Sequence, residues 1–177
     1  SWFPDNRRLV LATRPESGNA YTLSILDTVD GHKRTIGSAP TGFLYPSVSP
    51  DGTRIVYASS QTQGDVVEVS IPDATLRTLV SGGVALWPDW SPSGTHFIYA
   101  KRNDADAGID DRQAGADGFS RRLIGGRGIS EPEWSPDGSR LVFYSEFDAI
   151  SRLSIANASG SGVVQLVDFG IAKTAES

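Results

Sequence analysis

Short apolar or alternating runs, separated by polar turns, recur along the whole chain. The strongest are four runs of β-prone residues of the kind buried on both faces of a sheet, at 9–12, 55–58, 97–100 and 141–144. Alternating apolar and polar residues follow at 21–25, 67–71 and 153–156, as in half-buried strands. A further short strand closes each unit, at 34–36, 77–80, 121–124 and 164–167. The pattern predicts an all-β protein.

One turn phrase precedes each of the four strongest runs. It reads WFPDNRR at 2–8, VSPDGTR at 48–54, WSPSGTH at 90–96 and WSPDGSR at 134–140. Proline fixes φ, aspartate or serine bonds nearby backbone, and glycine or asparagine tolerates positive φ, so the phrase predicts a tight hairpin turn. Its defining positions are Trp2, Pro4, Pro50, Asp51, Gly52, Trp90, Pro92, Gly94, Trp134, Pro136, Asp137 and Gly138.

The spacing of the phrase predicts the architecture. Its prolines are separated by 46, 42 and 44 residues, a period typical of four-stranded propeller blades. With the strand that leads into each phrase, every unit has four strands, which bury their faces only by stacking on neighbouring units. We therefore expect one propeller domain over 1–177, with repeats at about 2–47, 48–89, 90–133 and 134–177. We assign Tyr57, Trp90, Tyr99, Trp134 and Phe143 to packing between blades. A sandwich or barrel would not explain the long period.

The phrase resembles the WD40-like (PD40) repeats of the TolB and tricorn-protease propellers, W-S-P-D-G followed by an apolar strand. The match is closest at 134–143, and the departures are Asn6 for the turn glycine, Val48 for tryptophan and Ser93 for aspartate. The resemblance implies a propeller of four-stranded antiparallel blades. For TolB it implies a cell-envelope scaffold that binds a lipoprotein, which favours a periplasmic or extracellular location without naming a partner here.

The number of blades in the assembled ring stays open. The distance from Pro136 through Ser177 and on to Pro4 is one more period, so the termini fall within the innermost strand of a blade. Three arrangements fit: a four-bladed ring, part of a larger ring, or a homodimer that completes an eight-bladed ring. We favour completion by a second copy or by further sequence, since the related families generally have more than four blades.

Composition narrows the classes of partner. With 16 Lys and Arg against 21 Asp and Glu, the chain has no broad basic field for a phosphate backbone, so nucleic acid is not expected. The absence of Cys excludes disulfides and thiolate chemistry. No apolar run approaches the roughly 20 residues that span a bilayer, so membrane insertion is not expected. Since Ser1 follows no initiator Met, we expect a longer precursor or gene.

No residue set for catalysis is recognisable. The string LVDFGIAK at 166–173 resembles a kinase metal-binding segment, but the other kinase motifs are missing, and the repeat places Asp168 in a loop between blades. His32 and His96 follow turns in different repeats, without visible partners, and no G-x-S-x-G elbow occurs. We therefore expect a non-enzyme without cofactors.

Two charged segments give weaker hypotheses. The acidic insertion 104–111 is expected in the loop between the second and third strands of its blade, where its carboxylates could hold Ca²⁺, although the spacing differs from that of an EF-hand and a solvated loop is favoured. Arg121, Arg122 and Arg127 could form a local positive spot, although solvated arginines at strand edges are commoner.

The residues that lead into the innermost strands gather at the axial mouth of a propeller. They form our candidate binding rim, which mixes aromatic and acidic side chains suited to a peptide or a basic group: Phe43, Tyr45, Trp87, Ile129, Glu131, Lys173 and Glu176. Plugging of the central channel by the same side chains is the alternative.

The functional hypothesis is a scaffold that recognises a protein or peptide, because stacked repeats place many loops on one face. Two alternatives remain open. One is an accessory propeller that gates a peptidase or hydrolase encoded elsewhere, and the other is an engineered or excised fragment that self-assembles and has no native function.

Overall fold

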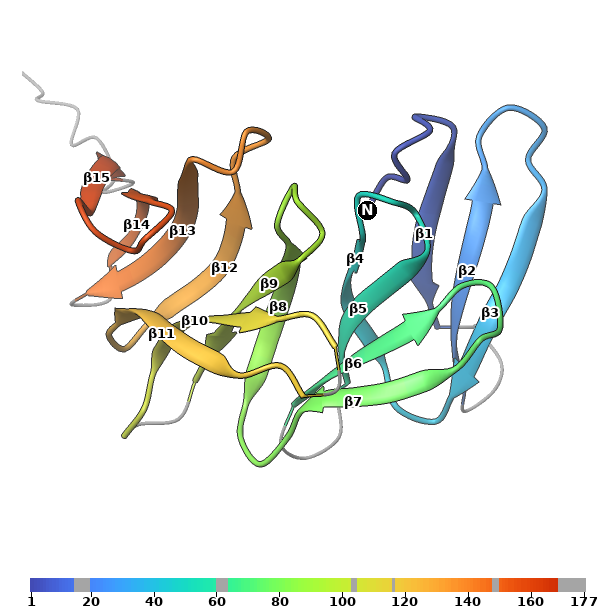
Figure 1. Ribbon diagram of the computed structural model, residues 1–177, viewed down its shortest axis with the longest axis horizontal. Helices are drawn as coiled ribbons and strands as arrows, with labels where there is room; N and C mark the ends of the chain where they lie inside the picture. Colours follow the sequence, from blue (N-terminus) through green and yellow to red (C-terminus); the bar gives the residue numbers. More distant parts are fainter. Residues whose placement is uncertain (15–19, 60–63, 103–104, 116, 148–149, 169–177) are drawn as a thin grey trace, which may run out of the picture.

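The computed structural model describes residues 1–14, 20–59, 64–102, 105–115, 117–147 and 150–168. Four antiparallel sheets follow one another along the chain and fan out as an arc, with β4, β8 and β12 on its inner side (Figure 1). The all-β fold built of propeller blades is therefore confirmed. No helix able to cross a membrane is found in these residues.

The second, third and fourth blades have four strands each. The second blade contains β4 (Phe43–Val48), β5 (Arg54–Ser59), β6 (Asp65–Ser70) and β7 (Leu76–Val80). The third contains β8 (Ala85–Trp90), β9 (His96–Lys101), β10 (Gly108–Gln113) and β11 (Ser120–Gly125). The fourth contains β12 (Ile129–Trp134), β13 (Arg140–Phe147), β14 (Ile150–Asn157) and β15 (Val164–Asp168).

The first blade is a three-stranded sheet of β1 (Arg8–Thr13), β2 (Tyr21–Asp27) and β3 (Lys33–Ala39). A single antiparallel bridge between Trp2 and Leu9 stands where the other blades have their innermost strand. The turn phrase therefore joins the innermost strand of each blade to the next strand.

Each turn phrase is closed by its own side chains. In the fourth blade the Ser135 hydroxyl donates to the Asp137 carboxylate at 2.6 Å, and the Ser139 amide donates to it at 3.0 Å. These hydrogen bonds hold the pKa of Asp137 at about 2. Gly138 follows with a φ of 68°, a conformation that glycine adopts without strain. Asn6 takes the same conformation in the first blade, with a φ of 53°.

Three apolar clusters hold the arc together, one at each junction between blades. Side chains of β1 and β2 meet those of β4 to β6 at the first junction, and the second joins β5 to β7 with β8 and β9. Ile98 and Ile109 meet Leu141 and Phe143 at the third. Successive residues of β5, the second strand of its blade, point to opposite faces of the sheet: Ile55 packs at the first junction and Val56 at the second. Each inner blade is thus buried on both faces.

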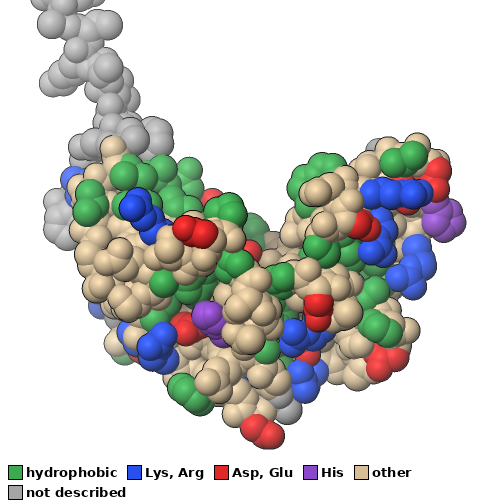
Figure 2. All heavy atoms as spheres, turned by 45° about the horizontal axis from the view of Figure 1, so that its top comes forward, with side chains coloured by type: hydrophobic (Ala, Val, Ile, Leu, Met, Phe, Trp, Pro, Cys, Tyr) green, Lys and Arg blue, Asp and Glu red, His purple; other side chains and the backbone are tan. Residues whose placement is uncertain are grey.

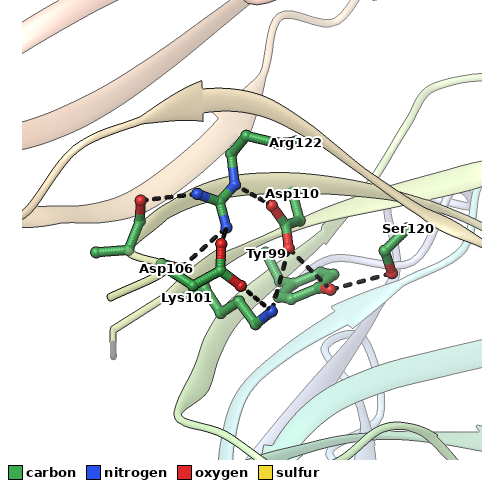
Figure 3. A network of polar contacts seen from close by, with 7 residues as sticks. Tyr99, Lys101, Asp106, Asp110, Ser120 and Arg122 are labelled. Carbon is green, nitrogen blue, oxygen red and sulfur yellow. Dashed lines mark hydrogen bonds and ion pairs between the residues drawn. The ribbon is translucent and has the colours of Figure 1, made fainter. Parts of the chain in front are cut away.

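The acidic segment of the third blade is part loop and part strand, so its prediction as a loop is wrong for residues 108–111. Gly108, Ile109, Asp110 and Asp111 begin β10, which pairs with β9 and β11. Arg122, on the neighbouring strand, binds the Asp110 carboxylate and also Asp106 (Figure 3). Cross-strand charge pairing lets this acidic run form a strand, because the buried carboxylates are neutralised.

Asp168 also lies in a strand and not in a loop between blades. It is the last residue of β15, where its backbone pairs with that of Arg152. The hydrogen-bond ladder extends one residue beyond the apolar run that the sequence displays.

Candidate functional site

The innermost strands β4, β8 and β12 share a bulge at the same place. In each, two residues oppose one residue of the neighbouring strand, with register shifts between Leu44 and Ser47 in β4 and at the equivalent points in β8 and β12. The first bulge residue has positive φ, 53° at Tyr45, 53° at Trp87 and 51° at Glu131. Proline follows each, and residues before proline normally stay extended. Such strain, about 1–3 kcal/mol per residue, tends to occur at functional sites.

These bulges line one cavity of about 580 Å³ on the inner side of the arc, the axial pocket. Tyr45 and Trp87 stand side by side, with ring centroids 5.3 Å apart and planes tilted by 42°. The lining combines aromatic, proline and acidic residues: Ser1, Trp2, Tyr45, Pro46, Ser47, Trp87, Pro88, Asp89, Glu131, Pro132, Glu133 and Trp134. Three carboxylates line it, and no Lys, Arg or His is among these residues, so the described part of the pocket attracts cations.

Asp89 is the most deeply placed of the three carboxylates. One oxygen accepts a hydrogen bond from the Ser47 hydroxyl at 3.0 Å, and the other accepts one from the Trp134 amide at 3.0 Å. Burial raises the pKa of Asp89, and the nearby charge of Glu133 acts in the same direction. The side chain therefore connects the inner strands of three blades.

The variant Asp89→Asn is expected to remove a pH dependence of stability. Because the pKa of Asp89 rises on folding, the folded state binds more protons than the unfolded state at pH values above 3.8, and stability falls as pH rises through the folded pKa. The asparagine side chain is neutral at every pH in this range, so the variant lacks this titration. Urea denaturation from pH 2 to 8 should show the variant gaining stability over the native chain as pH rises from 4 to 8.

Asp137→Asn is a control of opposite sign. Its pKa is lowered to about 2 on folding, so its contribution is present above pH 3.8 and is lost as pH falls toward 2. Parallel stability curves for the native chain and Asp89→Asn would contradict the role given to Asp89.

The structure divides the predicted rim. Tyr45, Trp87 and Glu131 come together at the axial pocket. Phe43 and Ile129 face away from it, into the junction clusters, and the Phe43 ring meets that of Tyr57 at 4.9 Å. The bulge explains the division, since it changes the side on which the following residues project. Lys173 and Glu176 lie outside the described residues.

Sequence reasoning missed the residues that follow the bulge proline. Ser47, Asp89 and Glu133 occupy one position of the repeat and all line the axial pocket, as do Trp2 and Trp134. The signal for the first three is a polar residue between proline and the first residue of the turn phrase. In a strand, successive side chains point to opposite faces, so the side chain at this position is expected to point away from the face covered by the next residue.

Several charged residues of the third blade are engaged in pairs. His96, expected to have no partner, lies 3.1 Å from the Asp111 carboxylate and packs edge-on against Trp134. Arg121 binds Asp111 at 3.1 Å, and Arg122 binds Asp106 and Asp110, so these two arginines do not form a free positive spot. No group of three or more metal-ligating side chains occurs in the residues that the structure describes. His32 is exposed.

Comparison with known proteins agrees with the geometry. This chain is 36% identical to the Tol-Pal system protein TolB of Alcanivorax borkumensis over 90 residues, which make up 49% of this chain and 20% of the relative. The chain is 34% identical to dipeptidyl-peptidase 5 of Porphyromonas gingivalis over 71 residues, which make up 36% of this chain and 10% of the relative. The chain therefore spans a fifth or less of these curated relatives.

Solved structures show the same fold. TolB from Acinetobacter baumannii superposes with a TM-score of 0.83 at 19% identity, over 94% of this chain and 42% of that one. The putative TolB from Agrobacterium tumefaciens gives a TM-score of 0.83 at 22% identity, over 94% of this chain and 63% of that one. The model of the TolB β-propeller domain (PD40) matches residues 1–176. With its repeated turn phrase and stacked blades, the chain belongs to the TolB β-propeller domain family.

Proposed function

We propose that this propeller is a non-catalytic recognition module whose axial pocket binds a basic segment of a protein or peptide. One observation carries the proposal: aromatic rings and three carboxylates converge on a single cavity from the inner edges of successive blades. Aromatic faces and carboxylates together favour Lys or Arg side chains, through cation–π attraction and ion pairing. A TolB relative bears the name of a component of the Tol-Pal system, in keeping with a protein partner.

The three bulge residues have distinct roles in this proposal. Tyr45, about half exposed, offers its ring to the aliphatic stem and charged head of the ligand residue. Trp87 supports the Tyr45 ring at a centroid distance of 5.3 Å, and the Arg102 guanidinium lies 5.6 Å from the centroid of the Trp87 ring. Glu131 supplies an exposed carboxylate at the same level of the neighbouring blade. Because the backbone conformation is fixed at each bulge, these groups are held in place before the ligand arrives.

Selection from a random heptapeptide display library tests the proposal. We expect the native chain to enrich peptides that contain Lys or Arg, and the synthetic peptides to lose affinity at least about tenfold in Trp87→Ala and in Glu131→Gln. Phe119→Ala, at a ring that is 62% exposed on the third blade outside the axial pocket, is the matched control. Selected peptides without basic residues, or equal binding to all variants, would exclude the axial pocket as a site for basic segments.

The similarity to dipeptidyl-peptidase 5 favours a second candidate function, an accessory propeller beside a peptidase domain carried on a separate segment of the same gene. In that case the axial pocket would select the segment that reaches the peptidase. The sequence of the encoding gene discriminates between the two: a hydrolase domain in the same reading frame favours the accessory role, and its absence favours the separate recognition module.

A further inference from the structure

Arg102 follows β9 directly and contacts a residue of the axial pocket. Its guanidinium lies over the Trp87 ring, 5.6 Å from the centroid, and its backbone N–H donates to the Val84 carbonyl at 2.9 Å, directly before β8. Trp87 lines the axial pocket and meets the Tyr45 ring at 5.3 Å. Arg102 is therefore attached through its backbone to the start of β8, and through its side chain to the Trp87 ring itself.

The charge of Arg102 has no partner among the described residues. Arg77, Arg121 and Arg122 each bind a carboxylate on a neighbouring strand. In the part of the chain that the structure describes, no carboxylate pairs with the exposed Arg102 side chain, and no acceptor takes a hydrogen bond from it. A guanidinium held over an aromatic face keeps its N–H groups at its edge, where they fit the two oxygens of a carboxylate. The donors of Arg102 are thus available to an acceptor that another molecule brings.

Arg54 shows the complete form of this arrangement inside the fold. Its guanidinium lies 4.5 Å from the centroid of the Trp90 ring. Its nitrogens donate to the Gly94 carbonyl at 3.0 Å and lie 3.6 Å from the Glu68 carboxylate. The ring orients the guanidinium, and the carboxylate neutralises it. At Arg102 the ring is present, and among the described residues no carboxylate takes the place of Glu68.

The charges around the axial pocket have both signs. Asp89, Glu131 and Glu133 line the pocket, and Arg102 adds a positive charge at the Trp87 ring. A ligand that carries only basic residues is attracted by the three carboxylates and repelled by Arg102, whereas a ligand with charges of both signs is complementary to all four. Figure 2 shows acidic and basic side chains interspersed on the face turned to the viewer, so the preference depends on individual side chains and not on a broad field of one sign.

The geometry limits the distance between the two charges of such a ligand. The Tyr45 and Trp87 rings are 5.3 Å apart, and the Arg102 guanidinium lies 5.6 Å from the Trp87 ring. Placed end to end, these contacts are no longer than about three residues of an extended peptide, at roughly 3.5 Å per residue. A basic side chain at Tyr45 and an acidic side chain at Arg102 can therefore come from residues up to about three positions apart.

We propose that Arg102 determines the specificity of the axial pocket by pairing with an acidic side chain of the ligand, up to about three positions from the basic side chain that meets Tyr45. The recognised segment then contains a basic and an acidic residue close together. This inference rests on the proposed function, since it takes the axial pocket as the site of a basic segment, and it adds the second charge that the ligand must carry.

Selection from the random heptapeptide library, with the native chain and with Arg102→Glu in parallel, tests the inference. We expect the native chain to select peptides with Asp or Glu within about three positions of Lys or Arg, and Arg102→Glu to lose the preference for Asp and Glu. Arg34→Glu, at an exposed arginine of β3 in the first blade, makes the same charge change outside the axial pocket and should keep the native preference.

Charge exchange in synthetic peptides measures the pairing directly. The peptides are amidated at the C-terminus, so that a side chain supplies the carboxylate. Replacing the acidic residue of the peptide by Lys should lower its affinity for the native chain at least about fivefold in titration calorimetry. Arg102→Glu should bind the Lys peptide more tightly than the acidic one, and Arg102→Gln, which only removes the charge, should bring the two affinities close together. A residue that only supports the Trp87 ring would not reverse the order of the two peptides.

The two proposals fail in different ways. A selection that yields no basic peptides would exclude the axial pocket as a site for basic segments, and this inference with it. Basic peptides without neighbouring acidic residues, equal affinity of the native chain for both synthetic peptides, or an unchanged affinity ratio in the Arg102 variants would overturn the role of Arg102 alone. Circular dichroism tests the folding of both variants, and Arg102→Gln decides the question if Arg102→Glu is unfolded.

Discussion

Replacing Phe97 by alanine is expected to lower the free energy of unfolding by about 3–5 kcal/mol. The Phe97 side chain is fully buried at the second junction. Its ring meets that of Trp90 edge-on at 5.7 Å and lies 6.0 Å from that of Tyr99. Removing it leaves a cavity at the centre of the arc, where blades on both sides restrict collapse. Urea denaturation of the native chain and the variant measures the difference.

Phe119→Ala is the matched control for Phe97→Ala, because the same side chain is removed from a position that is 62% exposed. We expect a change within about 0.5 kcal/mol there. Similar changes at both positions would show that the second junction contributes little to stability, and would contradict the description of the blades as mutually supporting.

Arg122→Ala is expected to destabilise the third blade by about 3 kcal/mol, since it removes the main partner of a buried carboxylate. Asp110 is 5% exposed and also accepts a hydrogen bond from the Tyr99 hydroxyl at 3.3 Å. Lys101 lies 3.9 Å from the same carboxylate and compensates in part (Figure 3). The loss should appear in urea denaturation and in faster amide exchange along β10.

Arg121→Ala provides the comparison for Arg122→Ala on the same strand. The Arg121 side chain is 60% exposed and binds Asp111 at 3.1 Å, a pair that solvent screens. Its loss should lower stability by less than about 1 kcal/mol. An equal or larger effect at Arg121 would mean that the network around Asp110 is not the element that stabilises β10.

Local sequence predicts much of this fold because the blade is mostly local. The turn at 134–140 follows from proline, aspartate and glycine acting on their own neighbours, and the apolar run at 141–144 continues directly into β13. The four-bladed arc then follows from the period. The strand β10 was not predicted because the neighbouring charged residues Asp110 and Asp111 break the alternation of apolar and polar residues that indicates a strand. Their neutralising partners, Arg122 and Arg121, come from a neighbouring strand.

The axial pocket was predictable in part. Tyr45 and Trp87 stand out as aromatic residues before proline at one place in the repeat, and the structure brings them together. The bulge cannot be recognised from the hydrophobic pattern of the sequence. Phe43 and Ile129 were therefore expected at the rim, although they pack in the junction clusters. Asp89 was missed because its importance depends on its contacts to two other blades.

The bulge residues that we propose to bind a ligand lie apart from the residues that hold the fold together. Tyr45, Trp87 and Glu131 belong to none of the three apolar clusters. Each carries backbone strain that glycine or asparagine would relieve, so the residues present are not those that stability alone would select. Under the proposed function, exchanges at these few positions would change the ligand preference while the stacked sheets and their turns stay the same.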